Sequence, residues 1–237
     1  MREHTRREIE QWWRDVFGVH DALWSHVTVR HPHGLLGDYA GWYVAWRGAG
    51  VHVSAPSSAD VDDVASLSRE AAISLQAVEF WHAFAQQRGL EVIGPGVHRY
   101  LDEDPGPGRD VREVDPSELR ALGDQVDVED WWECGFDESL DEPGVVAFAT
   151  EGGGAVLRKL DGAPRNVTLL VVPEARGRGL GTELGRAAAS YAVRHHGYAR
   201  WRSRDTNVAS TRAAQRLGFE SYATQLAVRP ASGSSED

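Results

Sequence analysis

One stretch, from Val167 to Thr182, constrains the fold of this chain more than any other. It reads VTLLVVPEARGRGLGT, so an apolar, β-rich segment runs into a turn with three alternate glycines, and an alanine-rich helical segment follows at once. Glycine lets the backbone adopt positive φ angles and approach a ligand closely. The free N–H groups at a helix start point at an anion, and the helix dipole adds to the attraction. The stretch therefore predicts a strand, turn and helix that cradle a pyrophosphate or another phosphorylated cofactor.

Two common phosphate-binding patterns fit this turn poorly. A P-loop needs Gly-Lys-Ser/Thr at the helix start, but Gly181-Thr182 lacks the lysine, and Lys159 is the only lysine of the chain. A dinucleotide fingerprint needs a glycine or alanine where Thr182 stands, and an acidic residue further on, for which Asp205 is a candidate. The residues before Asp205 alternate between polar and apolar types, which is not typical of a strand buried on both faces.

A third pattern, Arg-x-x-Gly-x-Gly, spans Arg176, Gly179 and Gly181. It resembles the coenzyme A pyrophosphate loop of the GCN5-related N-acetyltransferase (GNAT) family. The Val-Val-Pro step just before the loop is similar to the end of the preceding strand in that family. Downstream, the segment from Asn207 to Phe219 resembles the second family signature, an asparagine-led helix that ends in Leu-Gly-Phe. The resemblance is strongest over residues 140–228.

The resemblance implies an α/β fold of the acyl-CoA N-acyltransferase (GNAT-like) type, with a mixed central sheet flanked by helices. It also implies acetyl-CoA, or another acyl-CoA, as co-substrate, and direct transfer of the acyl group to a neutral amine. The backbone of residues 178–182 would hold the pyrophosphate, with Arg176 and Arg178 as charge partners. The strand at residues 170–172 would pair with the pantetheine arm, and the Val172 N–H would donate to the thioester oxygen. The cofactor-binding residues that match the family's motifs are Leu170, Val171, Val172, Arg176, Gly177, Arg178, Gly179, Leu180, Gly181, Thr182, Asn207 and Ser210. Asn207 is also expected to cap its helix.

The catalytic residues stay open at this stage, because the chain departs from the family at one position. Many members carry a tyrosine seven residues after the asparagine, as the acid for the departing thiolate, and Ala214 stands there. The proton could come from water, from Ser210 or from Tyr222. Glu133 and Glu151 are candidates for the general base. Glu133 could instead lie on a solvated helix face, and Glu151 could be an ordinary turn residue.

Composition limits the setting and the partners. Cys134 is the only cysteine, no apolar run reaches the length of a membrane span, and the N-terminus is charged, which together favour a reducing cytoplasm. The formal net charge of −11 argues against nucleic-acid binding and weakly favours cationic acceptors, although a local cleft can carry the opposite sign. We expect no membrane partner, and a monomer or a homodimer.

The histidines and the cysteine do not have the spacing of a metal-binding motif. His31 and His33 flank a proline, and His195-His196 end the long helix after the glycine turn, without carboxylate or cysteine partners at ligand spacing. We therefore expect no metal cofactor, and Cys134 is not a candidate nucleophile.

The chain divides into two parts at an acidic stretch that is rich in proline and glycine. We expect an N-terminal α+β region at 1–103, a linker at 104–110, a GNAT-like catalytic domain at 111–229 and a disordered tail at 230–237. The N-terminal region is either an appendage over the acceptor side or a degenerate second GNAT copy that does not bind coenzyme A. Helices are expected at 6–17, 58–68, 71–88, 116–126, 128–132, 180–195 and 207–217, and strands at 39–46, 51–54, 90–100, 111–114, 145–150, 155–160, 166–172, 198–204 and 219–228.

Two functions remain. The first is an N-acyltransferase that moves acetyl from acetyl-CoA to a primary amine of a small molecule or a protein. Its acceptor pocket could be lined by Trp12, Trp13, Trp131 and Trp132. The second is a non-catalytic acyl-CoA-binding module for sensing or assembly, which the alanine at position 214 favours. Neither the acceptor nor the length of the acyl chain can be read from the residues.

Overall fold

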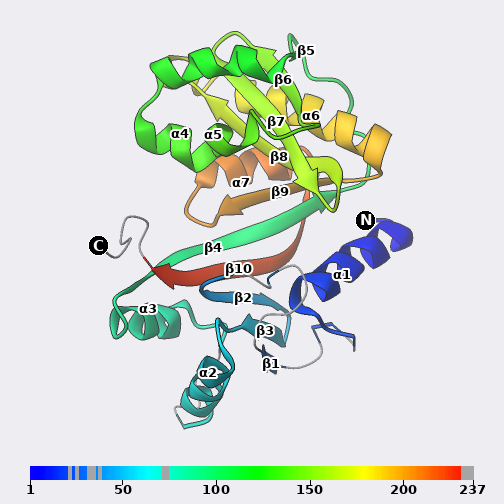
Figure 1. Cartoon of the computed structure of the whole chain (residues 1–237). Helices are drawn as coiled ribbons and strands as arrows, with labels where there is room; N and C mark the ends of the chain where they lie inside the picture. Colours follow the sequence, from blue (N-terminus) through cyan, green and yellow to red (C-terminus); the bar gives the residue numbers. More distant parts are fainter. Residues whose placement is uncertain (21–22, 25–26, 31–35, 37–38, 71–74, 231–237) are drawn as a thin grey trace. The chain divides into compact units, whose positions relative to one another are not determined.

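The chain, analysed as a computed structural model, is described at residues 1–20, 23–24, 27–30, 36, 39–70 and 75–230. It divides into two compact units. Unit 1 comprises Met1–Thr5 and His98–Ser221, and unit 2 comprises Arg6–Val97 and the residues from Tyr222 onward. Figure 1 shows the elements of both units in the colours of the sequence.

Unit 1 contains a mixed sheet with the strand order β9-β8-β7-β6-β5. Neighbouring strands are antiparallel from β5 to β8, and β8 and β9 are parallel. A parallel pair needs a crossover connection, which is why the long helix lies between β8 and β9 in the chain. The elements are β5 (Arg112–Val114), the 3-10 helix η2 (Pro116–Gln125), α4 (Val128–Cys134), α5 (Phe136–Ser139), β6 (Val146–Thr150), β7 (Gly153–Leu160), β8 (Ala163–Val171), the 3-10 turn η3 (Pro173–Ala175), α6 (Leu180–His196), β9 (Ala199–Arg204) and α7 (Val208–Arg216).

Two apolar clusters cover the two faces of this sheet. On one face Val167 of β8 packs in a cluster with Leu184 of α6 and with Trp201 and Ala214. On the other face Leu170 of β8 packs in a cluster with residues of η2 and α5. Successive strand residues point to opposite faces, so odd-numbered β8 residues from Val167 onward face α6 and α7, and even-numbered residues face η2, α4 and α5.

Unit 2 contains four neighbouring strands and its own core. Its strand order is β1-β3-β2-β10, with β1 parallel to β3 and the other neighbours antiparallel. The core contains Trp42, Val53, Trp81, Phe84 and Leu226. The elements are α1 (Glu3–Phe17), β1 (Val27–Arg30), β2 (Trp42–Arg47), β3 (Gly50–Ser54), α2 (Ser58–Glu70), α3 (Val78–Gln86), β4 (Leu90–Leu101) and β10 (Glu220–Pro230), of which α1, β4 and β10 are divided between the units.

Most predicted elements are present, with shifted ends. The hairpins at residues 42–54 and 146–160 are confirmed, whereas η2 is a 3-10 helix rather than an α-helix. The predicted strand at 90–100 contains Gly94-Pro95-Gly96, and β4 runs continuously through these residues. A Cβ on Gly94 would lie 3.0 Å from the Gln225 carbonyl oxygen, so the missing side chain lets β4 approach β10 closely. Residues 71–74 of the predicted helix 71–88, and residues 231–237 of the tail, lie outside the described residues.

The stretch predicted as a linker, 104–110, is attached to α6. The Arg186 side chain donates to the Pro105 carbonyl oxygen at 2.8 Å, and the Arg109 N–H donates to the Glu183 carboxylate at 2.9 Å. Gly108 permits this approach, because a Cβ there would lie 2.3 Å from the Glu183 carbonyl oxygen. The domain boundary at 104–110 stays a prediction, while the compact units divide inside α1, β4 and β10. No helix among the described residues is long and apolar enough to cross a membrane.

Candidate functional site

The glycine turn before α6 has the conformation expected of an anion cradle. Gly177 has φ of 79°, and Gly179, the residue that caps the start of α6, has φ of 83°. A Cβ at either position would meet nothing within 4 Å, so the loop borders open space. The Thr182 N–H donates back to the Gly179 carbonyl oxygen at 2.9 Å. Within the described parts of the chain, no acceptor is found for the N–H groups of residues 179–181, which stay available to an anion.

The strands β8 and β9 diverge beside this loop. Only two residue pairs join them, Asn166↔Arg200 and Val167↔Trp201. Yet β8 continues to Val171 and β9 to Arg204. Beyond Val167, the β8 backbone groups that point toward β9 therefore face a gap. An extended ligand in this gap can form hydrogen bonds with them, as an added strand would.

The backbone donor that faces this gap is not the one expected from the sequence. The Val172 N–H donates to the Gly152 carbonyl oxygen at 2.9 Å, so the expectation that it is available to a thioester oxygen is wrong. Val171 pairs with Gly153 across the antiparallel ladder. Hydrogen-bonded and non-hydrogen-bonded pairs alternate along such a ladder, so the Val171 N–H and carbonyl point away from β7, toward the gap. The register, which the sequence does not reveal, decides this difference.

Arg176 connects the end of β8 to α4. Its Nε donates to the Val171 carbonyl oxygen at 3.0 Å, and its Nη2 pairs with the Asp130 carboxylate. Asp130 was not singled out from the sequence, and the Arg-x-x-Gly-x-Gly pattern gave no indication that its arginine would turn toward α4. Arg178 is exposed in the loop. Of the two predicted charge partners, Arg178 is thus the one without a carboxylate partner among the described residues.

The start of α7 lies against β9. The Asn207 side-chain oxygen accepts from the Ser210 N–H at 2.9 Å, which confirms its expected capping of α7. The Ser210 hydroxyl accepts from the Trp201 indole N–H at 2.9 Å. Ala214, one turn further, is fully buried in the cluster on the α6 and α7 face. The position of the family's tyrosine is therefore filled by a core residue in this chain.

Comparison with known families now identifies this part of the molecule. Residues 111–219 match the model of the acetyltransferase (GNAT) family. Residues 111–219 form a GNAT domain. The mixed sheet flanked by helices on both faces, with a glycine loop before α6 and diverging strands beside it, is the GNAT-like acyl-CoA N-acyltransferase fold that the sequence predicts. Family membership supports an acyl-transfer function of the acetyltransferase type, for which the family generally uses acetyl-CoA.

Solved structures with a similar chain trace share little sequence with this chain. A GNAT-family protein from Novosphingobium aromaticivorans is 19% identical with a TM-score of 0.44, covering 59% of this chain and 66% of its own. A GNAT-family acetyltransferase from Colwellia psychrerythraea is 12% identical with a TM-score of 0.45, and the match covers 58% of this chain and 56% of that one. A tandem GNAT protein of the clavulanic acid biosynthesis pathway is 22% identical with a TM-score of 0.42, and the match covers 62% of this chain and 57% of that one. The aligned part thus spans less than two thirds of each of these chains, and none of the curated proteins matches the sequence.

The two candidate bases of the GNAT domain lie at different places. Glu133 of α4 lies with its carboxylate 3.9 Å from Nε of Arg204, the last residue of β9, and its side chain is 41% exposed. The α4 helix thereby borders the gap between the diverging strands. Glu151 is exposed in the turn between β6 and β7, and it lines a surface hollow with residues 110–112. Glu133 thus contacts the end of β9, whereas Glu151 precedes Gly152, whose carbonyl oxygen accepts from Val172 just after the end of β8.

The candidate acid Tyr222 belongs to unit 2. Its hydroxyl accepts from the Trp24 indole N–H at 3.3 Å, and the Arg47 guanidinium lies 4.2 Å from its ring centre. Burial raises the pKa of the Tyr222 hydroxyl, which keeps the phenol protonated at neutral pH.

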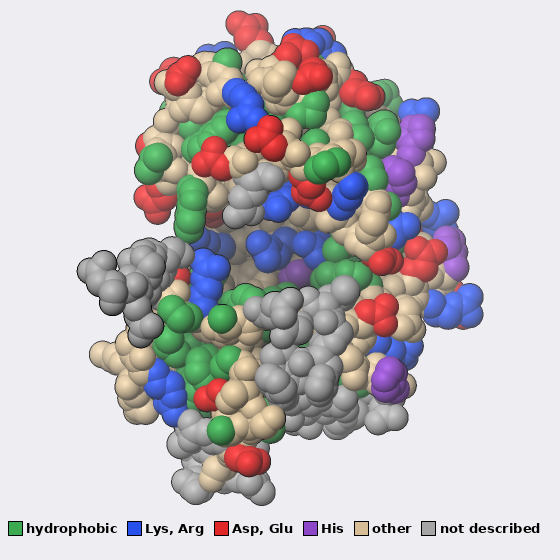
Figure 2. Space-filling model, viewed as in Figure 1, with side chains coloured by type: hydrophobic (Ala, Val, Ile, Leu, Met, Phe, Trp, Pro, Cys, Tyr) green, Lys and Arg blue, Asp and Glu red, His purple; other side chains and the backbone are tan. Residues whose placement is uncertain are grey.

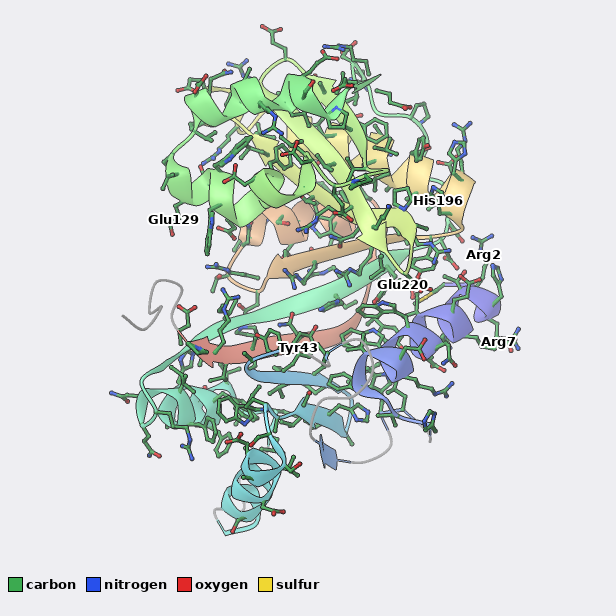
Figure 3. All side chains as sticks on the ribbon, in the orientation of Figure 1. Arg2, Arg7, Tyr43, Glu129, His196 and Glu220 are labelled. Atoms are coloured by element: carbon green, nitrogen blue, oxygen red, sulfur yellow. The ribbon has the colours of Figure 1, made fainter. Side chains whose placement is uncertain are left out.

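The surroundings of two other reactive side chains, Cys134 and His196, shift their pKa values. Burial raises the pKa of the Cys134 thiol to about 11, so it is protonated and a poor nucleophile at neutral pH. His196 lies at the carboxyl end of α6 (Figure 3), where its carbonyl oxygen accepts from Arg165 at 3.0 Å. Burial lowers the pKa of the His196 imidazole. Among the described residues, no three or more histidine, cysteine or acidic side chains lie close enough together to hold a metal ion.

Proposed function

We propose that this chain is an acyl-CoA-dependent N-acyltransferase that moves the acetyl group of acetyl-CoA to a primary amine by direct attack. One combined observation carries the proposal. The glycine loop offers unpaired N–H groups at the start of α6, and the strands beside it diverge after Val167 and Trp201. An anion cradle next to an open strand edge suits a ligand with a pyrophosphate at one end and an extended amide arm at the other.

The described residues fit such a cofactor. The backbone of residues 178–182 would hold the pyrophosphate, with Arg178 as charge partner. Residues 170–172 of β8 would pair with the pantetheine arm, and the Val171 N–H would donate to the thioester oxygen. Asn207 and Ser210, at the start of α7, lie beside β9 and complete the proposed cofactor-binding set. The cofactor supplies an activated thioester, and the protein supplies donors and positions.

The chemistry then needs few further groups. The amine nitrogen attacks the thioester carbon, the carbon–sulfur bond breaks, and the sulfur leaves as a thiolate. The amine proton passes to a base, and the thiolate gains a proton from water or from the Ser210 hydroxyl. A coenzyme A thiol is acidic enough to leave without a dedicated acid, so alanine at position 214 does not exclude turnover. Tyr222 stays an alternative acid.

Glu133 is our candidate general base, since α4 places it beside the end of β9. We expect Glu133→Gln to lower kcat by about 10²- to 10⁴-fold, because the amide keeps the size of the side chain but cannot accept the proton. Steady-state rates with acetyl-CoA and a fixed amine would check this. Glu151→Gln is the matched control and should change kcat by less than about twofold. Equal losses in the two variants would exclude Glu133 as the specific base.

A non-catalytic acyl-CoA-binding module is the second candidate, and the fully buried Ala214 favours it. Thiol release from acetyl-CoA with a panel of amines, run beside calorimetric binding of acetyl-CoA, separates the two. Turnover on any amine supports the enzyme. Tight binding without turnover supports the module, and no binding of coenzyme A or its thioesters refutes both. The same proposal includes a small-molecule or protein amine as acceptor, a cytoplasmic location, no nucleic-acid or membrane partner, and a monomer or homodimer.

A further inference from the structure

Three arginines lie on one face of β9. Arg200, Arg202 and Arg204 are two residues apart, so their side chains point to the same side of the strand. The intervening Trp201 and Ser203 are buried and point to the opposite side, where Trp201 packs in the cluster with α6. The alternation of charged and buried residues was visible in the sequence, but only the fold gives the arginines a common surface.

The arginine face is the face of the sheet that carries α4. The Arg200 Nε donates to the Asn166 side-chain oxygen at 2.9 Å, and Asn166 is an even-numbered residue of β8. Arg204 pairs with Glu133 of α4 at 3.9 Å. The glycine loop and α6 belong to the other face, because Leu184 of α6 packs against Val167. The proposed cofactor cradle and the arginine face are therefore on opposite sides of the sheet in unit 1.

Arg202 differs from its two neighbours. It is exposed, and in the part of the chain that the structure describes it has no recorded hydrogen bond or ion pair. Figure 2 colours the Lys and Arg side chains blue and the Asp and Glu side chains red on one face of the molecule. The flanking arginines are held by partners on β8 and α4, so the strand between them is fixed while the Arg202 guanidinium keeps its donors available.

Arg202 is thus a positive charge with no carboxylate partner among the described residues, on a chain whose net charge is −11. A charge of this kind suits an anionic ligand. A guanidinium presents paired N–H donors that match carboxylate and phosphate oxygens. The gap between β8 and β9 opens next to Arg202, beyond the last paired residue Trp201.

We propose that Arg202 binds a carboxylate or phosphate group of the acceptor amine, so that the acceptor is a zwitterion such as an amino acid or an aminoalkyl phosphate. This inference rests on the proposed acyltransferase function. The anionic group lies on the arginine face, the thioester approaches from the α6 face, and the acceptor nitrogen meets it in the gap between the strands. Arg200, whose partner Asn166 is neutral, adds to the positive field around Arg202.

Matched pairs of amines test this proposal. The probes are L-amino acids with their amides, and phosphoethanolamine with ethanolamine, so that the carboxylate and phosphate arms are read separately. Thiol release gives kcat and KM, and calorimetric titration, with and without saturating coenzyme A, gives binding without any need for turnover. In at least one arm we expect the anionic amine to bind about 10- to 100-fold more tightly than its neutral partner.

Variants tie the preference to Arg202. Arg202→Gln should remove the preference for the anionic amine and leave the neutral one within about twofold, whereas Arg202→Lys should retain part of it. The control is Arg212→Gln. Arg212 is an exposed arginine on α7, which packs on the opposite face of the sheet, so this variant should change neither the binding of the anionic amine nor that of the neutral one. Thermal unfolding checks that all variants fold.

The outcomes separate this proposal from the function on which it rests. The acceptor proposal is overturned if the enzyme turns over both amines of a pair equally well. It is also overturned if Arg202→Gln loses the same activity with both amines of a pair. Either result leaves the acyltransferase function intact. Absence of turnover with any amine refutes the enzyme. The titration then decides alone. If the unchanged protein binds the anionic amine more tightly and Arg202→Gln does not, an anion site at Arg202 is supported. If the unchanged protein shows no such preference, the anion site is rejected.

Discussion

The Gly179→Val variant is expected to lose coenzyme A binding by at least about 100-fold. Gly179 has φ of 83°, a conformation that costs an ordinary L-residue roughly 1–2 kcal/mol and is worse for a β-branched one. Its Cβ position also borders open space at the start of α6, which the pyrophosphate would occupy. A side chain there would keep the phosphate oxygens away from the backbone N–H groups. Isothermal titration with coenzyme A measures the effect.

Gly162→Val is the control for backbone strain. Gly162 has φ of 73°, has nothing within 4 Å of its Cβ position, and lies in the turn between β7 and β8. Both variants should lose a similar amount of stability in chemical denaturation, but only Gly179→Val should lose binding. Normal coenzyme A affinity in a folded Gly179→Val protein would disprove the pyrophosphate cradle.

The Trp201→Ala variant is expected to lose about 3–5 kcal/mol of unfolding free energy. Trp201 is 3% exposed, lies in a T-shaped contact with Phe219 at 5.4 Å, and donates its indole N–H to Ser210. It also approaches α6 so closely that a Cβ on Gly185 would lie 2.6 Å from the indole. Truncation leaves a cavity between β9, α6 and α7 at the last residue pair before the strands diverge. Denaturant unfolding of the whole chain measures the loss.

Trp132→Ala serves as the comparison, because the same truncation is made at a side chain that is 65% exposed. It should change stability by less than about 0.5 kcal/mol. Trp201→Phe, which keeps an apolar ring but cannot donate to Ser210, should fall between the two. If Trp201→Ala unfolded at the denaturant concentration of the unchanged protein, the packing described for this face would be wrong.

The cofactor loop could be predicted from the sequence because its elements are local. The glycine spacing, the β-rich segment before it and the helix after it are consecutive in the chain, and each needs only its own neighbours to adopt its conformation. The cap at Asn207 is local in the same sense, since its partner is the N–H of Ser210. The family signatures cover this loop and this cap.

The catalytic and acceptor groups could not be predicted in the same way. Glu133 and Glu151 looked equivalent as candidates, and only the fold joins Glu133 to the end of β9. Arg176 matched the loop pattern, yet it pairs with Asp130, which is far from it in the chain. Burial of Ala214 depends on the packing of α7 onto β9 and α6, so the sequence showed the missing tyrosine but not what filled its place.

By itself, then, the sequence predicted the GNAT segment, its strand, glycine loop and helix, and the order of the elements around them. Only the tertiary structure decided that Val171 rather than Val172 faces the gap, because the register with β7 sets the direction of each backbone donor. It also decided that three arginines of β9 form one charged face opposite the cradle. Alternation along a strand places side chains on two sides, but the partners of each side come from chain segments that folding alone brings together.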